Sequence, residues 1–114
     1  MKPPVTERVL GLLGLCARAR KLVIGTALIC TALSKGESKG APVLVIEAAD
    51  SSANTHKRIT DRCTHYGVRA VRIEADCATL AHRIGKGDAA VAAVGVTDAQ
   101  LARAILAALE DNND

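Results

Sequence analysis

The sequence has almost no aromatic residues: its 114 residues include one Tyr and neither Phe nor Trp. Proteins that hold single-stranded nucleic acid by stacking need several aromatic side chains on one surface, as does an aromatic cage for a cationic ligand. Both kinds of site are therefore disfavoured. Since 49% of the residues are apolar, a chain of this length can still bury a real core, and disorder is not expected.

Motifs for enzymatic chemistry are also missing. Gly85-Lys86-Gly87 lacks the spacing of a phosphate-binding loop, no dinucleotide-binding fingerprint is present, and no Ser lies on a nucleophile elbow. Glu47 and Asp50 are explained by a solvated surface and a helix cap rather than by a pair of catalytic carboxylates. The histidines are isolated in the sequence, at polar helical positions: His56, His65 and His82. We expect no catalytic residue and a protein that is not an enzyme.

Cysteine occurs four times, without any Cys-x-x-Cys pair. Cys16, Cys30 and Cys63 lie in apolar helical stripes, where a free thiol acts as a small hydrophobic group. Cys63-x-His65 is the one close pair of metal-ligand type, and Cys63 is predicted to face the core. We therefore expect free thiols in a reducing cytosol, with neither a metal site nor a cofactor.

No segment is apolar for long enough to span a bilayer. The apolar run at 9–17 includes Cys16 and must be compared with a lipoprotein signal. Glu7 interrupts its basic start, Leu15 is too large for the cleavage position, and Arg18 follows at once. A signal peptide is therefore not expected, and the sequence predicts a cytoplasmic protein with no membrane partner.

A strand followed by a helix organises the rest of the chain. Val43–Ile46 is a continuous apolar run, the pattern of a strand covered on both faces. Asp50–Ser52 can accept hydrogen bonds from the first N–H groups of the next helix, on which Ile59, Cys63 and Tyr66 form one apolar face. The N-terminus of such a helix suits phosphate or another anion, although an ordinary strand–helix unit explains the same pattern.

Apolar periodicity and turn residues predict nine elements in the order α-β-α-β-α-β-α-β-α. Strands are expected at 20–24, 43–46, 69–73 and 89–96, the third of them near an edge. Helices are expected at about 6–19, at 26–35, from Ser52 to Gly67, from Asp76 to Gly85, and from the capping box Thr97-Asp98-Ala99-Gln100 to Leu109. This alternation predicts an α/β fold, a three-layer α-β-α sandwich around a mostly parallel or mixed sheet.

Two details of the helices carry expectations of their own. Gly11 and Gly14 lie inside the first helix, where each costs about 1 kcal/mol relative to Ala, so another element is expected to approach closely there. In the second helix, Leu28, Ile29 and either Ala32 or Leu33 are assigned to the inner face.

Charge is distributed unevenly along the chain. Residues 1–72 hold 12 Lys/Arg against 5 Asp/Glu, whereas residues 73–114 hold 3 against 7, so polyanions would be steered to the basic half. The strand–helix junctions at Gly25, 50–54 and 85–88 are expected to meet at one edge of the sheet. Six cations lie on or beside these junctions and suit a nucleic-acid backbone: Arg18, Arg20, Lys21, Lys57, Arg58 and Lys86.

Three segments resemble the signatures of a known family. The first is Leu13-x-x-x-Ala17-Arg18-x-x-Lys21-Leu22-Val23-x-Gly25. The second and most specific is 50–63, which reads Asp-Ser-Ser-Ala-Asn-Thr-x-Lys-Arg-Ile-Thr-Asp-Arg-Cys, and the third is Leu80–Lys86, ahead of the Ala/Val strand. Together they resemble the bacterial YlxQ-type proteins of the kink-turn RNA-binding ribosomal protein superfamily (L-seven-Ae and L-thirty-e). The resemblance covers about Val5–Leu109.

The resemblance implies a sandwich around a small mixed sheet, formed by residues 1–114 as a single RNA-binding domain. In this superfamily the N-terminus of the second helix enters a kink-turn, and the loop before the last strand clasps an extruded base; here these elements are Gly25–Leu28 and Gly85–Ala90. The implied partners are RNA, either ribosomal RNA or another kink-turn RNA, and ribosomal, transcription or translation proteins. With the basic junctions, the predicted RNA-binding residues are Arg20, Lys21, Gly25, Thr26, Ala27, Leu28, Ser52, Asn54, Lys57, Gly85, Lys86 and Gly87.

The chain departs from the superfamily pattern at the second helix. Archaeal and eukaryotic kink-turn binders carry Asn-Glu two and three residues after the glycine, whereas this chain has Ala27 and Leu28. Three residues further on, where those proteins carry a basic residue, this chain has Thr31. Ala and Leu side chains have no hydrogen-bonding group with which to read a base. Two alternatives therefore stay open. One is a protein-interaction or regulatory module that kept the fold but lost specific RNA readout. The other is the substrate-recognition part of an RNA-modifying enzyme. The absence of a catalytic part argues against this second alternative.

Overall fold

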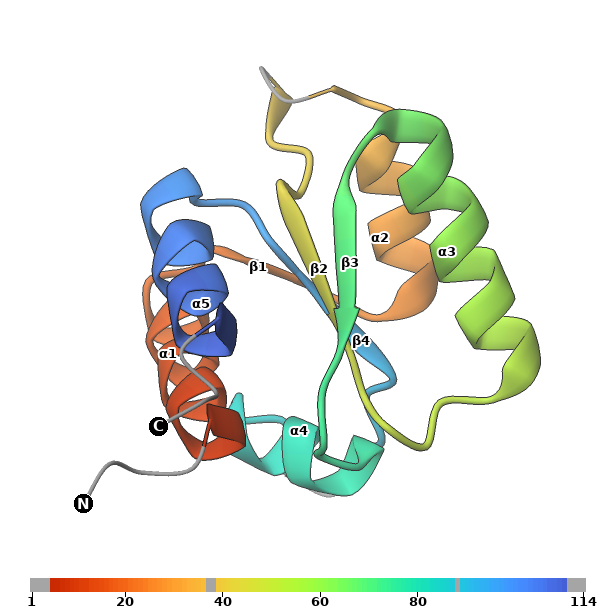
Figure 1. The fold of residues 1–114 in the computed structure, drawn as a ribbon. Coiled ribbons are helices and arrows are strands. Elements are labelled where there is room, and N and C mark those ends of the chain that lie inside the picture. Colours follow the sequence, from red (N-terminus) through yellow and green to blue (C-terminus); the bar gives the residue numbers. More distant parts are fainter. Residues whose placement is uncertain (1–4, 37–38, 88, 111–114) are drawn as a thin grey trace.

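The computed structural model describes residues 5–36, 39–87 and 89–110, and it confirms the predicted order of nine elements (Figure 1). The helices are α1 (Val5–Arg18), α2 (Thr26–Leu33), α3 (Ala53–Tyr66), α4 (Cys77–Arg83) and α5 (Ala99–Glu110). The strands are β1 (Leu22–Ile24), β2 (Leu44–Glu47), β3 (Arg69–Arg72) and β4 (Ala93–Val96).

The four strands form one mixed sheet in the order β1-β4-β2-β3. β2 and β3 are parallel, whereas β4 runs antiparallel to both β1 and β2. Every residue of β2 and β4 is buried, and the edge strand β3 is mostly exposed, as its alternating sequence predicts. Because β4 is antiparallel to its neighbours, β1, β2 and β3 end at the same edge of the sheet at which β4 begins. We call this the junction edge.

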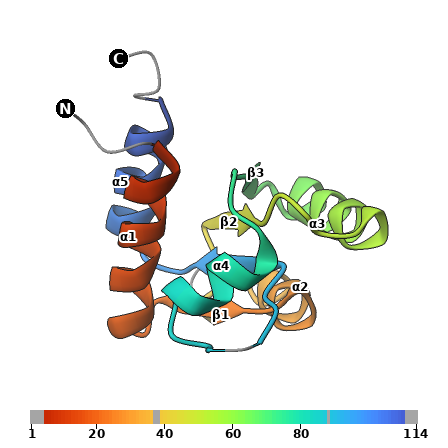
Figure 2. The same cartoon turned by 90° about the horizontal axis from the view of Figure 1, so that it is seen from below.

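Helices cover both faces of the sheet, which confirms the three-layer sandwich. Successive residues of β2 point to opposite faces: Leu44 and Ile46 pack with α1, α4 and α5, whereas Val45 packs with α2 and α3. Figure 2 shows the pair α1 and α5 on one side and the pair α2 and α3 on the other. Among the described residues, no helix is both long enough and apolar enough to cross a membrane.

Close packing accounts for two glycines. A Cβ on Gly95, in β4, would lie 2.6 Å from Pro42 Cγ, and a Cβ on Gly14 would lie 3.3 Å from the carbonyl oxygen of Arg83. The expected close approach is therefore confirmed at Gly14, where α4 packs on α1. It is wrong at Gly11, since no atom of the chain would lie within 4 Å of a Cβ there.

Three local predictions are corrected. The last strand begins at Ala93 instead of Ala89, because its partners β1 and β2 end opposite Val94 and Ala93. Asp98 rather than Thr97 caps α5, since its Oδ1 accepts hydrogen bonds from the N–H groups of Gln100 and Leu101 at 2.8 and 3.1 Å. The third correction concerns Leu28, which was assigned to the core but is 62% exposed.

The burial of the thiols agrees with the sequence. Cys16, Cys30 and Cys63 are buried and free, and burial is the main cause that raises the pKa of the Cys16 and Cys63 thiols to about 11. These cysteines therefore act as small core residues.

Candidate nucleic-acid interface

A groove of about 530 Å³ lies against β1 and α2, at the edge of the sheet that β1 forms. We call it the β1–α2 groove. Its apolar wall comes from the three residues of β1 and from Leu28 and Ala32 of α2. Three lysines also line it: Lys35, Lys39 and Lys86. The described lining residues include no carboxylate, so they combine apolar surface with positive charge.

Lys86 reaches this groove from the segment between α4 and β4. Gly85 and Gly87 on either side of it have φ angles of 84° and 59°, a backbone conformation that glycine adopts without steric cost. The Lys86 N–H donates to the carbonyl of Ala81 at 2.8 Å, which anchors the turn to α4. The turn thus brings Lys86 to the groove that Leu28 lines, so two predicted RNA-binding segments converge. Asp88, in the same predicted loop, lies outside the described residues.

The N-terminus of α2 adjoins the same groove. Gly25 precedes the helix with a φ of 100°, and its N–H donates to the carbonyl of Ala93 at 3.1 Å. Within the described part of the chain, no side chain caps α2, whereas Ser52 caps α3 and Asp76 caps α4. The first-turn N–H groups at Thr26 and Ala27 therefore keep the partial positive charge of a helix start, which favours an anion.

The N-terminus of α3 is less open than the sequence predicted. Ser52 Oγ accepts a hydrogen bond from the Thr55 N–H at 3.1 Å. Asn54 is exposed beside it. Lys57 is also exposed, but its Nζ lies 2.8 Å from Asp61 Oδ2. This hydrogen bond and the charge of Asp61 raise the pKa of Lys57. Asp61 therefore partly balances the positive charge of Lys57.

Asp50 caps a different helix from the one predicted. Its Oδ1 accepts a hydrogen bond from the Cys77 N–H at 2.8 Å, at the start of α4. Hydrogen bonds from the Cys77 thiol and then from its N–H lower the pKa of Asp50. Burial, followed by the bond to Asp50, raises the pKa of Cys77 to about 11.

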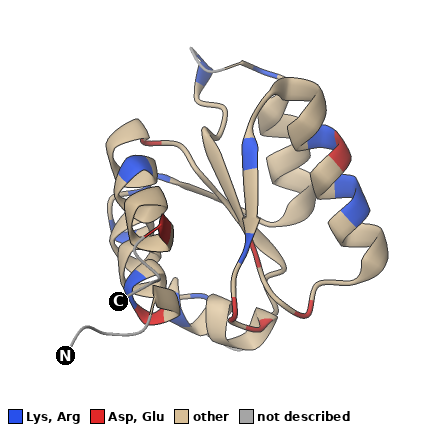
Figure 3. Ribbon diagram, viewed as in Figure 1, with Lys and Arg blue, Asp and Glu red and all other residues tan. Residues whose placement is uncertain are grey.

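Acidic residues therefore gather at the start of α4. Asp76 Oδ1 accepts from the Thr79 N–H at 2.7 Å, which places a second carboxylate beside Asp50 at the same helix N-terminus. Figure 3 shows red segments at α4, whereas blue segments occur along α3 and α1. The two carboxylates give the start of α4 a negative charge, which repels a polyanion there.

Arg20 and Lys21 lie away from the junction edge. The carbonyl of Lys21 accepts a hydrogen bond from the Thr97 N–H at 3.0 Å, where β4 has ended. Gly25 is four residues further on, about 13 Å along an extended chain. The backbone of these two cations thus lies at the other end of β1 from the Gly25 junction, and their role in RNA binding stays a prediction.

A buried polar cluster at the junction edge escaped the sequence analysis. Glu47 ends β2 and is 2% exposed, not solvated as predicted. Ser51 Oγ donates to Glu47 Oε2, and His56 Nδ1 lies 2.8 Å from Oε1. Arg72 Nη2 donates to Ser51 Oγ at 3.0 Å and lies 3.6 Å from Glu47 Oε2. His56 therefore has a partner in the fold. The sequence held a clue that Glu47 is buried, because Glu47 directly follows an apolar run that predicts a central strand.

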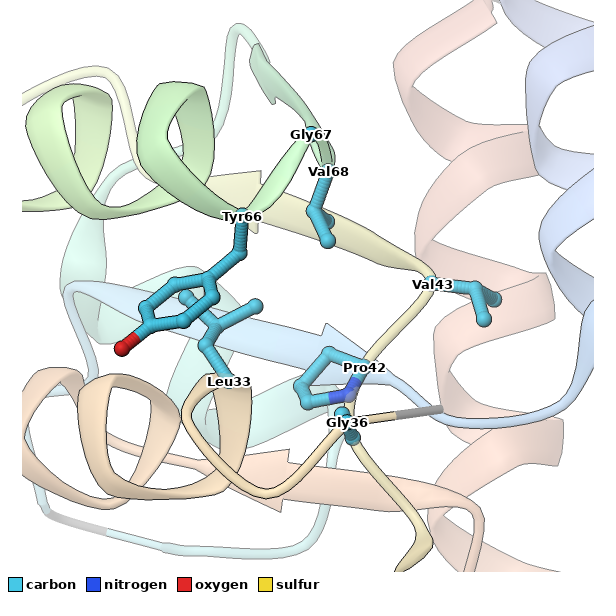
Figure 4. Close-up of a pocket in the computed structure, with 8 residues that line it drawn as sticks. Leu33, Gly36, Pro42, Val43, Tyr66, Gly67 and Val68 are labelled. Atoms are coloured by element: carbon cyan, nitrogen blue, oxygen red, sulfur yellow. The ribbon is translucent and has the colours of Figure 1, made fainter. Parts of the chain in front are cut away.

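A second pocket lies at the opposite edge of the sheet, where β2 and β3 begin (Figure 4). It has a volume of about 300 Å³, and Leu33, Pro42, Tyr66 and Val68 are among its lining residues. Tyr66, which was predicted to lie on the apolar face of α3, is 38% exposed here. The described lining residues of this pocket carry no charged side chain that could bind a phosphate. Among the described residues, no cluster of His, Cys, Asp and Glu could hold a metal ion.

Comparison with known proteins decides the family, although no family model matches the chain. The RNA-binding protein YlxQ of Bacillus subtilis (strain 168) is 37% identical over 99 residues, which cover 87% of this chain and 92% of that protein. The chain belongs to the YlxQ family. The resemblance found in three sequence segments is therefore confirmed.

Solved structures share the YlxQ-family fold. A Bacillus halodurans protein described as having unknown function superposes with a TM-score of 0.80 and 31% identity, over 91% of this chain and 98% of that one. The Giardia lamblia 15.5 kDa RNA-binding protein superposes with a TM-score of 0.72 over 98% of this chain and 90% of that one. Its identity of 18% supports the shared fold alone.

Proposed function

We propose that this YlxQ-family protein is a non-enzymatic protein that binds structured RNA through the β1–α2 groove. The observation that carries the proposal is that three lysines, and no carboxylate among the described residues, line a groove beside the N-terminus of α2, which no described side chain caps. The names of the B. subtilis and Giardia relatives support the class of ligand. In finer terms, we propose that residues 1–114 form one cytoplasmic RNA-binding domain, and that its ligand is a kink-turn, in ribosomal RNA or elsewhere.

The groove suits RNA because it offers two kinds of contact. Lys35, Lys39 and Lys86 neutralise phosphates, which supplies affinity that depends on salt rather than on sequence. The apolar wall that includes Leu28 contacts a ribose or the face of an extruded base. Since Ala27 and Leu28 offer no hydrogen-bonding group, recognition rests on the shape of the RNA backbone.

A second candidate function has an observation in its favour. Leu28 is 62% exposed in the first turn of α2, next to Ala27, and two adjacent apolar residues on a helix surface also suit a protein partner. In that case the fold serves as a protein-interaction module, and the lysines select an acidic partner rather than RNA.

The experiment is a salt titration of binding to a kink-turn RNA beside a straight RNA duplex. If the three lysines each neutralise one phosphate, the logarithm of the association constant falls with the logarithm of salt concentration with a slope of roughly 3. The kinked RNA is expected to bind more tightly than the duplex at every salt concentration. Equal affinity for the two RNAs would reject kink-turn recognition, and weak binding with a shallow slope would favour the interaction module.

A matched pair of variants tests the groove itself. Lys86→Ala removes one lining cation and is expected to lower the salt slope by about 1. Arg103→Ala removes one exposed cation from α5, on the other face of the sheet, and is expected to leave the slope unchanged. Equal losses in the two variants would show that only net charge matters and that the groove is not the RNA site.

A further inference from the structure

The exposed face of α3 carries a row of hydrogen-bonding side chains. Its four members are exposed and follow one another at spacings of four, four and three residues: Asn54, Arg58, Arg62 and His65. Residues so spaced lie on one stripe of a helix. All four side chains can donate hydrogen bonds, and none of them is apolar. We call this row the α3 stripe.

The positive charge of the α3 stripe is not balanced by other groups of the protein. Asp61 is the one carboxylate of α3, and it lies 2.8 Å from the ammonium of Lys57. Among the described residues, no carboxylate forms an ion pair with Arg58 or Arg62. Two arginines four residues apart on a helix repel each other and lower its stability. Contacts within the fold therefore do not explain this pair, whereas a row of anions outside the protein would stabilise it.

The α3 stripe lies close to the proposed RNA site. α3 packs beside α2, which forms one wall of the β1–α2 groove, and buried side chains of both helices, among them Ile29 and Ile59, belong to one cluster (Figure 2). Both helices begin at the junction edge, because α2 follows β1 and α3 follows β2. The stripe thus starts, with Asn54, at the edge of the sheet where the N-terminus of α2 also lies.

We propose that the α3 stripe binds the sugar-phosphate backbone of an RNA stem that extends from the β1–α2 groove, an inference that rests on the proposed function. Arg58 and Arg62 are about 6 Å apart along the helix axis, which is similar to the separation of successive phosphates along one RNA strand. Arginine suits this role because its guanidinium donates paired hydrogen bonds to phosphate. An acidic protein partner fits less well, since protein interfaces are rich in aromatic residues at their centre and the stripe has no apolar residue.

The test compares two kink-turn RNAs whose stems differ in length. In the short RNA the stems are only long enough to form the kink, and in the long RNA each stem is extended by a full helical turn. Arg58→Gln/Arg62→Gln removes both charges, and glutamine has about the same helix propensity as arginine. With the long RNA, we expect the salt slope to fall by about 2 in this double variant. With the short RNA, we expect no change.

A second double variant is the matched control. Arg18→Gln/Arg103→Gln removes two exposed cations from α1 and α5, which cover the other face of the sheet, so the change in net charge is the same. Its salt slope should equal that of the unmodified protein with both RNAs. In NMR spectra of the unmodified protein, the amide signals of α3 should shift further with the long RNA than with the short one.

Two results would overturn the proposal. Equal salt slopes for the two double variants with the long RNA would show that the α3 stripe does not contact RNA, and would favour an acidic protein partner instead. An equal loss with the short and the long RNA would show that the stripe does not bind an extended stem. The proposed function fails separately: Lys86→Ala with the short RNA reports on the groove alone, and an unchanged slope there would reject the groove whatever the α3 variants show.

Discussion

The carboxylate of Glu47 and the imidazole of His56 hold the end of β2 against the first turns of α3. His56 Nδ1 lies 2.8 and 3.0 Å from the two carboxylate oxygens. Ser51 donates to the same carboxylate, and Arg72 reaches it from the neighbouring edge strand. Burial of a charged group is costly unless its hydrogen bonds are satisfied, and here three side chains from separate positions satisfy it.

Replacement of Glu47 by Gln is the direct test of this cluster. The amide keeps the shape but replaces an acceptor oxygen with a donor, so Ser51, His56 and Arg72 cannot all keep their contacts. We expect a loss of about 1–3 kcal/mol in the free energy of unfolding, measured by urea denaturation. Glu74→Gln, at an exposed position, is the control and should change stability by less than about 0.5 kcal/mol. Equal effects would mean that the cluster does not stabilise the fold.

The cap of α4 makes stability depend on pH. The pKa of Asp76 is lowered from its ordinary value of 3.8, chiefly by the backbone hydrogen bond from Thr79. A carboxyl whose pKa is lower in the folded than in the unfolded protein stabilises the fold above its unfolded pKa, and this contribution is lost as the pH falls through the folded pKa.

Asp76→Asn isolates this contribution, because Asn is also a good N-cap but carries no charge. We expect the variant to be less stable than the unmodified protein at pH 7. The difference should shrink progressively as the pH falls below 3.8, as followed by urea denaturation between pH 7 and pH 3 or so. A difference that stays constant over this range would show that the carboxylate charge of Asp76 contributes nothing.

Gly11 and Gly14 of α1 form a matched pair for packing. Gly11→Ala adds a methyl group in open space, so it should raise the free energy of unfolding by about 1 kcal/mol through helix propensity. Gly14→Ala gains the same propensity, but its Cβ would lie 3.3 Å from the Arg83 carbonyl oxygen, and α4 must shift. We expect Gly14→Ala to be less stable than Gly11→Ala by about 1 kcal/mol or more in urea denaturation. The reverse order would contradict the packing of α4 on α1.

Most of the fold could be predicted from the sequence because its signals are local. The unbroken apolar run before Glu47 predicts a central strand, and the residues that cap α3 and α4, Ser52 and Asp76, were identified correctly. The alternation of strands and helices left a mostly parallel and a mixed sheet open, and the family resemblance favoured the mixed one. Apolar periodicity does not tell whether β4 runs parallel or antiparallel.

The wrong predictions concern residues whose burial or partners are set by tertiary contacts. In α2, apolar residues occur on all sides of the helix, so periodicity could not show that Ile29 is buried and Leu28 exposed. The partners of Asp50 and Glu47 lie up to 27 residues away in the sequence, and no local pattern indicates them. For the candidate site, the sequence identified Leu28 and Lys86 but missed Lys35 and Lys39, which join the groove only through the fold.

Leu28 offers a gain-of-function test of the RNA proposal. Leu28→Lys adds a fourth lysine to the lining of the β1–α2 groove, at a side chain that is exposed and therefore free to change without loss of stability. If RNA phosphates lie in this groove, the variant should bind the kink-turn RNA more tightly at low salt, with a salt slope steeper by about 1.

The control for Leu28→Lys is Gln100→Lys, which adds the same charge at an exposed position on α5. A lysine there changes the net charge of the protein, but the sheet separates it from the groove. It can therefore affect RNA binding only by long-range attraction, which salt screens within about 10 Å at 0.1 M. We expect the slope for Gln100→Lys to match that of the unmodified protein. If the two variants strengthen RNA binding equally, the RNA does not lie in the β1–α2 groove, and the proposed interface must be abandoned.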